Sequence, residues 1–194
     1  MPKIVDIQER ERAVSEAAWR VMARDGVTAL SVRNVAAEAG MSPSSMRHFF
    51  PTQASVRVRA VALLLDRLVQ RVAEAESGHD GPQRALAILL ELLPLDRERR
   101  TEMEVTLAFG ALAMTDSALR ETHQQIFDTV RTVCARAVRS LGADDSEVPG
   151  THALIDGIAL HLVQQQPGAE TGWVLDAVQR WIERLPRAAA STAS

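Results

Sequence analysis

The sequence predicts an all-α protein with an N-terminal three-helix domain built around a helix-turn-helix, followed by a larger C-terminal helical domain. Alanine, leucine, arginine, glutamate and valine dominate, aromatic residues make up 4% of the chain, and no stretch alternates as a strand does. Apolar residues recur instead at helical spacing along most of the 194 residues. A chain of this length can hold one small and one medium domain, each with its own core.

The first helix is predicted from about Asp6 to Arg24. Its inward side is assigned to a stripe of small and apolar residues: Ala13, Ala17, Ala18, Val21 and Met22. Ser31 is placed to cap a second helix, and Gly40 to supply the left-handed turn that ends it. The apolar residues of that second helix face the same core: Val32, Val35, Ala36 and Ala39.

A third helix is predicted to begin at Ser42, whose hydroxyl can accept a hydrogen bond from a free amide, with Pro43 at its first position. Met46, Phe49 and Phe50 point inward. The residues left facing outward are Ser44, Ser45, Arg47 and His48. A short helix that hides one apolar stripe and displays hydroxyls, an arginine and a histidine is typical of DNA recognition. A structural helical hairpin with a solvated outer face is the alternative.

A long helix is predicted next, from Gln53 to about Glu76; at about 1.5 Å per residue it spans roughly 36 Å and can enter a second domain. Turn-rich residues 77–82 end it. Further helices are predicted at 83–93, 97–114, 117–141, 151–166 and 171–185, with a loop at 142–150. The predicted organisation is a helix-turn-helix domain at 1–52, a connecting helix at 53–76, a second helical domain at 77–186, and a disordered tail at 187–194.

The net charge of −3 is unevenly distributed. Residues 1–60 hold nine Lys or Arg and six acidic residues. Between Gly26 and Ala60 there are four arginines, and Glu38 is the single acidic residue. The local charge of the first domain therefore favours phosphate binding, although the net charge of the whole chain does not.

Residues 10–67 resemble the N-terminal domain of the TetR family of transcriptional repressors. The motifs that carry the resemblance are Arg24-Asp25-Gly26-Val27, Leu30-Ser31-Val32-Arg33, Val35 to Gly40, and Arg47 to Gln53. The chain has Arg47 and His48 where the family usually has a tyrosine, and Gln53 where it often has a lysine; both look like a known family variant. The resemblance implies a homodimeric regulator, by default a repressor, that binds a palindromic double-stranded DNA operator and is released by a small-molecule effector. It makes residues 1–52 the DNA-binding domain and residues 77–186 the effector-binding and dimerisation domain.

From these motifs we predict which residues meet the duplex, with Arg47 reading a base edge and the hydroxyls, amide and helix-end amides holding phosphates. The predicted DNA contacts are Arg33, Ser42, Pro43, Ser44, Ser45, Arg47, His48, Thr52 and Gln53.

The second domain offers weaker candidates for an effector pocket, since core packing explains each of them better than a ligand contact when taken singly. These candidates are Met103, Leu107, Phe109, Met114, His123 and Phe127. As a lone histidine on an apolar stripe, His123 fits a satisfied core position better than a ligand contact. Glu102 and Glu104 are candidates to face a cationic effector, with a solvated helix face as the alternative.

The last two predicted helices present apolar stripes suited to a four-helix bundle about a twofold axis. The predicted dimer interface is Ile155, Ile158, Leu162, Val174, Val178, Trp181, Ile182 and Leu185. Burial within one subunit is the alternative. Residues 153–160 also resemble the C-terminal domain of the BetI-type branch, from which no particular effector is inferred.

Other function classes fit the sequence poorly. The five histidines have no metal-site spacing, no glycine-rich loop follows a strand, and no cofactor or catalytic residue is expected, so an enzyme is disfavoured. No apolar run is long enough for a membrane span, and a cytoplasmic protein is expected. Cys134 is interpreted as a buried thiol. The remaining alternative is a structural or partner-binding helical protein without DNA binding.

Overall fold

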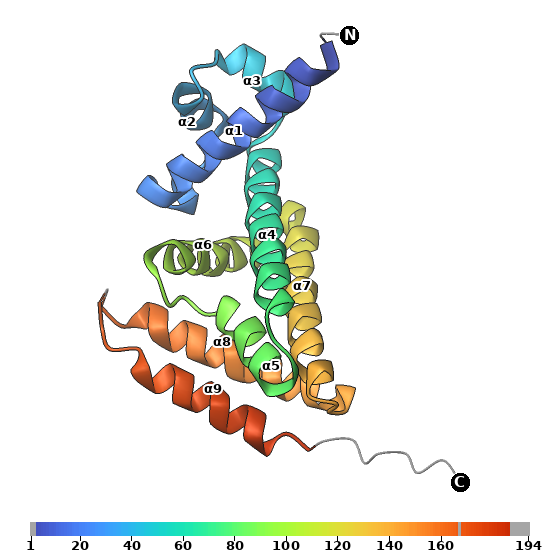
Figure 1. Ribbon diagram of the computed structural model, residues 1–194. Coiled ribbons are helices and arrows are strands. Elements are labelled where there is room, and N and C mark those ends of the chain that lie inside the picture. Colours follow the sequence, from blue (N-terminus) through green and yellow to red (C-terminus); the bar gives the residue numbers. More distant parts are fainter. Residues whose placement is uncertain (1–2, 167, 187–194) are drawn as a thin grey trace. The chain divides into compact units, whose positions relative to one another are not determined.

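The computed structural model describes residues 3–166 and 168–186, and within these it confirms the all-α prediction, with no strand. None of the described helices is long and apolar enough to cross a membrane. The α-helices (Figure 1) are α1 (Lys3–Asp25), α2 (Val32–Glu38), α3 (Pro43–Phe49), α4 (Gln53–Ser77), α5 (Gly81–Glu91), α6 (Arg97–Ala113), α7 (Arg120–Ser140), α8 (Val148–Gln164) and α9 (Gly172–Arg184). Short 3-10 helices lie at Val27–Ala29, Ser117–Leu119 and Asp145–Glu147.

The chain divides into two compact units. The first unit holds the residues up to Asp66 together with Glu104–Gln124, and the second holds Arg67–Met103 and the residues from Gln125 onward. Three helices, α4, α6 and α7, therefore continue from one unit into the other. The division places the second half of α6 and the start of α7 in the same unit as the N-terminal helices.

The first unit is built on the apolar stripe of α1. Val14, Ala17, Ala18 and Val21 are at most 2% exposed and pack with buried residues of α2, α3 and α4. The sequence prediction included Ala13 in this stripe and omitted Val14. That assignment is wrong, because Ala13 is exposed and Val14 is buried. Positions 14, 17, 18 and 21 have the spacing of one helix face, and position 13 lies beside it.

The core of the second unit joins the end of α4 to α5, α7, α8 and α9 (Figure 1). Seven of the eight residues proposed above for a dimer interface lie in this core, each at most 8% exposed in the single chain, and only Trp181 among them is half-buried. The indole nitrogen of Trp181 donates to the Thr151 hydroxyl at 3.0 Å. These side chains pack inside the subunit, so the predicted interface residues need revision.

Most helix bounds agree with the sequence prediction, and the differences reach three residues at the starts of α1, α7 and α8. Residues 148–150 were predicted as loop, but α8 begins at Val148 with Pro149 in its first turn. The first turn tolerates proline because no amide hydrogen is needed there. Asp144, whose carboxylate accepts from the amide of Ser146 at 2.8 Å, caps the preceding 3-10 turn. The predicted disordered tail, residues 187–194, lies outside the described residues.

Cys134 lies on the inner face of α7 and is fully buried, as expected. Burial raises the pKa of its thiol to about 12, with a smaller contribution from the negative charge of Asp156. A thiolate is the reactive form, so the folded protein holds this cysteine in an inert state.

We therefore expect Cys134 to resist modification by iodoacetamide at pH 8 in the folded protein and to react readily in denaturant. The measurement is the mass of the intact chain after timed exposure to the reagent. Complete labelling of the native chain within minutes would contradict the burial described here.

Candidate nucleic-acid interface

The turn between α2 and α3 is held by two backbone hydrogen bonds around Gly40. The Gly40 amide donates to the Ala37 carbonyl at 3.2 Å and the Met41 amide donates to the Ala36 carbonyl at 2.8 Å. Gly40 has φ of +66°, in the left-handed region. This pattern is a Schellman motif, and its glycine turns the chain with no Cβ penalty. The predicted role of Gly40 is confirmed.

Side-chain caps define where α2 and α3 begin. The Ser31 hydroxyl accepts from the Asn34 amide at 3.1 Å, and the Ser42 hydroxyl accepts from the Ser45 amide at 3.1 Å. Pro43 occupies the first turn of α3. Both predicted caps are therefore present, and an N-cap of this kind contributes about 1 kcal/mol.

The inner side of α3 is anchored by Met46, which is fully buried, and the chain after it by Phe50, which is 7% exposed. Ser44, Ser45 and Arg47 are exposed. His48 and Phe49 belong to α3, but their side chains lie outside the described part of the structure. The helix thus hides one stripe and leaves hydroxyls and a guanidinium on its outer side.

The three serines at the start of α3 form one cluster. The Ser42 hydroxyl lies 2.9 Å from the Ser44 hydroxyl and 2.9 Å from the Ser45 hydroxyl. Ser42 accepts its capping bond at the same time, so its oxygen orients both neighbours. Three of the predicted DNA contacts are therefore hydrogen-bonded to one another at the start of α3.

Thr52 and Gln53, two further predicted contacts, also have internal roles. The Thr52 hydroxyl accepts from the Ser55 amide at 3.0 Å, and the Ser55 hydroxyl accepts from the Thr52 amide at 3.2 Å, which caps α4 reciprocally. The Gln53 side-chain amide donates to the Leu30 carbonyl at 3.3 Å. Both residues remain exposed, and Gln53 ties the start of α4 to the segment before α2.

The acidic residue within this basic region is held against α1. Glu38 accepts from Arg20 Nε at 2.8 Å and from Arg24 Nη1 at 2.9 Å. These hydrogen bonds from Arg20 and Arg24 lower the pKa of Glu38. Arg33 and Arg47 are exposed. The negative charge of Glu38 is thereby balanced, which keeps the local field favourable to phosphate.

The predicted effector residues are not gathered around one described cavity. Phe109 is fully buried and Met103 half-buried, whereas Leu107, Met114 and Phe127 are 40%, 80% and 48% exposed. His123 is exposed, so its interpretation as a core residue is wrong. Gly110 allows α6 to approach the His123 ring of α7 closely, because a Cβ at position 110 would lie 3.1 Å from His123 Cε1.

The two acidic candidates for contact with a cationic effector lie in different surroundings. Glu102 is only 8% exposed and forms an ion pair with Arg71, while Glu104 is exposed. Among the described residues no group of three His, Cys, Asp or Glu side chains is arranged to hold a metal ion.

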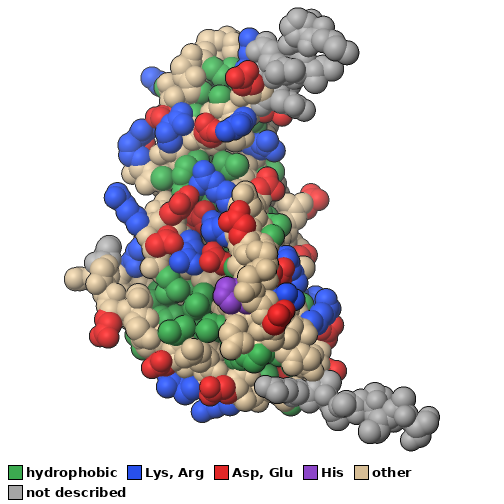
Figure 2. Space-filling model, in the orientation of Figure 1, with side chains coloured by type: hydrophobic (Ala, Val, Ile, Leu, Met, Phe, Trp, Pro, Cys, Tyr) green, Lys and Arg blue, Asp and Glu red, His purple; other side chains and the backbone are tan. Residues whose placement is uncertain are grey.

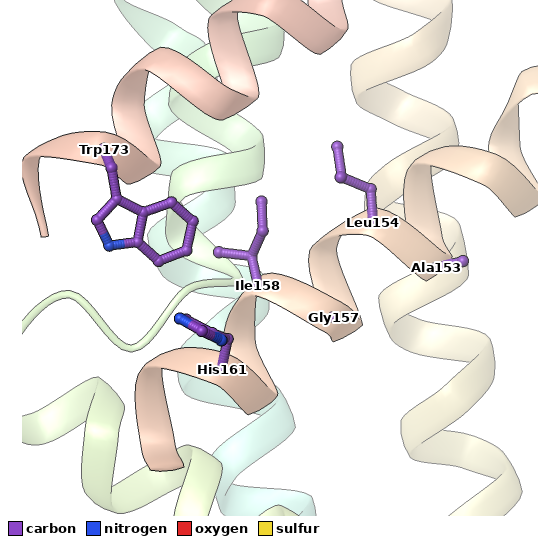
Figure 3. Close-up of a pocket in the computed structure, with 6 residues that line it drawn as sticks. All are labelled: Ala153, Leu154, Gly157, Ile158, His161 and Trp173. Carbon is purple, nitrogen blue, oxygen red and sulfur yellow. The ribbon is translucent and has the colours of Figure 1, made fainter. Parts of the chain in front are cut away.

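A groove of about 380 Å³ lies between α8 and α9 of the second unit, lined by Ala153, Leu154, Gly157, Ile158, His161 and Trp173. His161 and Trp173 point toward one another across it (Figure 3), with ring centroids 5.3 Å apart and perpendicular planes. Apolar side chains gather on the surface over these helices (Figure 2). The groove lies beside the predicted interface stripe of α8, with Ile158 common to both, and its small residues Ala153 and Gly157 are ones that the sequence singled out for close helix approach.

Two family profiles match the chain. Residues 15–59 match the profile described as "Bacterial regulatory proteins, tetR family", and residues 82–187 match "BetI-type transcriptional repressor, C-terminal". The first match covers the capped turn, α3 and the start of α4, and the second covers the helices that contain the groove.

Individual proteins and structures agree with the profiles. The HTH-type transcriptional regulator PksA of Bacillus subtilis (strain 168) is 36% identical over 168 residues, covering 83% of this chain and 82% of PksA. A transcriptional regulator from Rhodococcus sp. Rha1 has a TM-score of 0.77 at 28% identity, with 90% of this chain and 95% of that chain covered. The multidrug binding protein EbrR, complexed with ethidium, has a TM-score of 0.69 at 26% identity, with coverage of 91% and 99%.

The pairing of Glu38 predicts a pH dependence of stability. Its pKa is lower in the folded chain than its ordinary value of 4.5, so the stabilisation is present above that pH and is lost as the pH falls through the folded pKa. We expect the thermal unfolding midpoint, followed by circular dichroism, to fall more steeply with acidification in the native chain than in Glu38→Gln. Glu183→Gln, an exposed change on α9, serves as the control and should follow the native profile. If the unfolding midpoints of the native chain and Glu38→Gln fell in parallel with acidification, the ion pairs of Glu38 with Arg20 and Arg24 would contribute nothing to stability.

Proposed function

The chain belongs to the TetR family of transcriptional regulators, and we propose that it acts as a homodimeric repressor that binds a palindromic operator and is released by a small-molecule effector. The observation that carries this proposal is the α2–α3 turn, in which a glycine motif and serine caps present the outer side of α3. A recognition helix of this kind lies in the major groove of the duplex.

We assign direct readout to Arg47, since an exposed guanidinium can donate two parallel hydrogen bonds to the O6 and N7 atoms of guanine. The hydroxyls of Ser44 and Ser45 and the exposed side chain of Arg33 are assigned to phosphates, which fix position and not sequence. Ser42, Pro43, Thr52 and Gln53 are assigned to the same backbone contacts through hydroxyls, amide and helix ends. His48 stays a proposed contact on the strength of its position in α3.

We place the subunit interface on the exposed side of α8 and α9, where the groove between Gly157 and Trp173 is open. Leu160 and Leu175, at 44% and 43% exposed, extend the apolar surface of these two helices. A twofold dimer presents two recognition helices about one helical turn of DNA apart, or a multiple of it, so an imperfect palindrome is the matching operator.

Release by an effector requires that the effector bind one arrangement of the dimer more tightly than the other. The helix proposed to transmit this difference is α4, which is continuous from the DNA-binding unit into the second unit. Because EbrR, at 26% identity, is complexed with ethidium, organic cations are the first class of effector to screen.

The proposal is tested by selecting bound duplexes from a random DNA pool with the full chain, then measuring affinity for the selected sequence at several salt concentrations. A preferred palindrome whose binding weakens steeply with salt is expected, because each phosphate neutralised releases counterions. Failure to enrich any sequence in dilute buffer would reject the proposal in favour of a helical protein that binds other partners.

Replacing Arg47 by alanine is expected to weaken binding to the selected operator by about 1 to 3 kcal/mol, because a bidentate base contact is lost. The measurement is a titration of labelled duplex with the native chain and the variant. Arg47→Lys is the matched variant, since it keeps the positive charge but lacks the planar fork, and it should lose sequence preference more than total affinity. An operator affinity unchanged in Arg47→Ala would remove Arg47 from the interface.

Gly157→Glu is expected to convert the dimer into single subunits, because it puts a charge and a long side chain on the apolar groove. A Cβ built at Gly157 meets no atom within 4 Å, so the subunit itself has room for the change. Gly78 has equal room outside the groove, and Gly78→Glu is therefore the control. Sedimentation velocity measures the outcome, and a Gly157→Glu chain that sediments as the native dimer would place the interface elsewhere.

A further inference from the structure

The first two turns of α6, residues 97–103, carry charged side chains that reach three other helices of the second unit. We propose that these turns form a charged junction, consisting of Glu98, Arg99, Arg100 and Glu102, which couples the distal half of α4 to the C-terminal end of α8. The proposal rests on the proposed function and concerns its regulation. It assigns the relay between the DNA-binding unit and the dimer helices to named ion pairs.

The junction binds α4 through two acidic residues. Glu98 pairs with Arg67 at 3.2 Å. Glu102 binds Arg71 through two parallel hydrogen bonds, with Nη2 to Oε2 at 2.7 Å and Nη1 to Oε1 at 3.2 Å. Glu102 is 8% exposed and Arg71 is half-buried, and the two parallel hydrogen bonds fix the geometry of the pair. The position of α4 is therefore tied to that of α6.

The same α4 arginine connects the junction to α5. Arg71 Nε lies 3.2 Å from Glu91 Oε2, and Arg99 of the junction lies 3.4 Å from the same oxygen. Arg99 also donates to the Leu90 carbonyl at 3.0 Å and pairs with Asp96 at 2.7 Å. The end of α5 thus holds Arg71 and Arg99 in register, so that α4 and α6 share one fixed partner.

The junction reaches α8 through Arg100. Its guanidinium donates to the carbonyls of Leu162, Val163 and Gln165 at 2.8, 2.7 and 2.8 Å. These carbonyls lie at the end of α8, where the helix dipole favours a positive charge, and that of Leu162 also accepts from the Gln165 amide at 3.2 Å. Arg100 therefore acts as a charged C-cap supplied by another helix.

Coupling follows from the positions of these residues on α6. Glu102 and Arg100 are two residues apart on one helix, so a rotation or translation of α6 moves the α4 contact and the α8 contact together. The end of α8 that Arg100 caps is next to His161, which lines the groove proposed as the dimer interface. A shift of α4 on operator binding is thereby transmitted to the dimer helices, and a shift at the dimer helices is transmitted back with equal coupling energy.

The test uses hydrogen–deuterium exchange of the full chain, read by mass spectrometry on peptides that cover residues 160–166, with and without a saturating selected operator. In the native chain we expect operator binding to change exchange at this end of α8 by about two-fold or more. In Arg100→Gln that change should disappear while the operator still binds. Arg97→Gln removes an exposed charge from the same turn and should behave as the native chain.

A second variant keeps the test decisive if Arg100→Gln folds poorly. Glu102→Gln removes the charge that holds Arg71 but leaves the Arg100 contacts in place, and it should also abolish the change at residues 160–166. Persistence of the native change in either folded variant would overturn the junction, as would its absence in an operator-bound native chain. Failure of the native chain to bind any operator is a different result, which rejects the proposed function itself.

Discussion

The left-handed backbone of Gly40 is the constraint on which the proposed DNA contacts depend. Its two hydrogen bonds, from Gly40 to Ala37 and from Met41 to Ala36, end α2 and set the direction in which α3 leaves. The Ser42 cap and the buried side chain of Met46 then fix the start of α3 and its rotation about its own axis. With direction and rotation determined, Ser44, Ser45 and Arg47 lie on the exposed side of α3.

The distribution of charge is compatible with the proposed DNA contacts, although the chain as a whole is not basic. A protein with a net charge of −3 can bind a polyanion only if its acidic residues lie away from the contact surface. Glu38 meets this condition because Arg20 and Arg24 hold it against α1. In the second unit Glu91, Glu98 and Glu102 likewise bind arginines of neighbouring helices and join the helices to one another.

The sequence allowed good prediction of features governed by local chemistry. The caps at Ser31 and Ser42, the turn at Gly40 and the helical class depend on residues within a few positions of each other, and each is confirmed. Features set by distant partners were not predictable. An apolar stripe such as Ile155 to Leu162 shows that a helix face is buried, but not whether its own chain or a second copy covers it, and here it is its own chain. The Arg100 cap on α8 joins residues more than sixty positions apart and leaves no local pattern.

The most direct test of the account is guanine methylation interference on the selected operator, since N7 methylation blocks an acceptor that is accessible only in the major groove. The account predicts interference at guanines in two symmetric half-sites whose centres are about 10 base pairs apart, or a multiple of that spacing. Absence of interference at every guanine N7 of the bound site, or interference confined to a single half-site, would contradict the presentation of α3 by a symmetric pair of subunits.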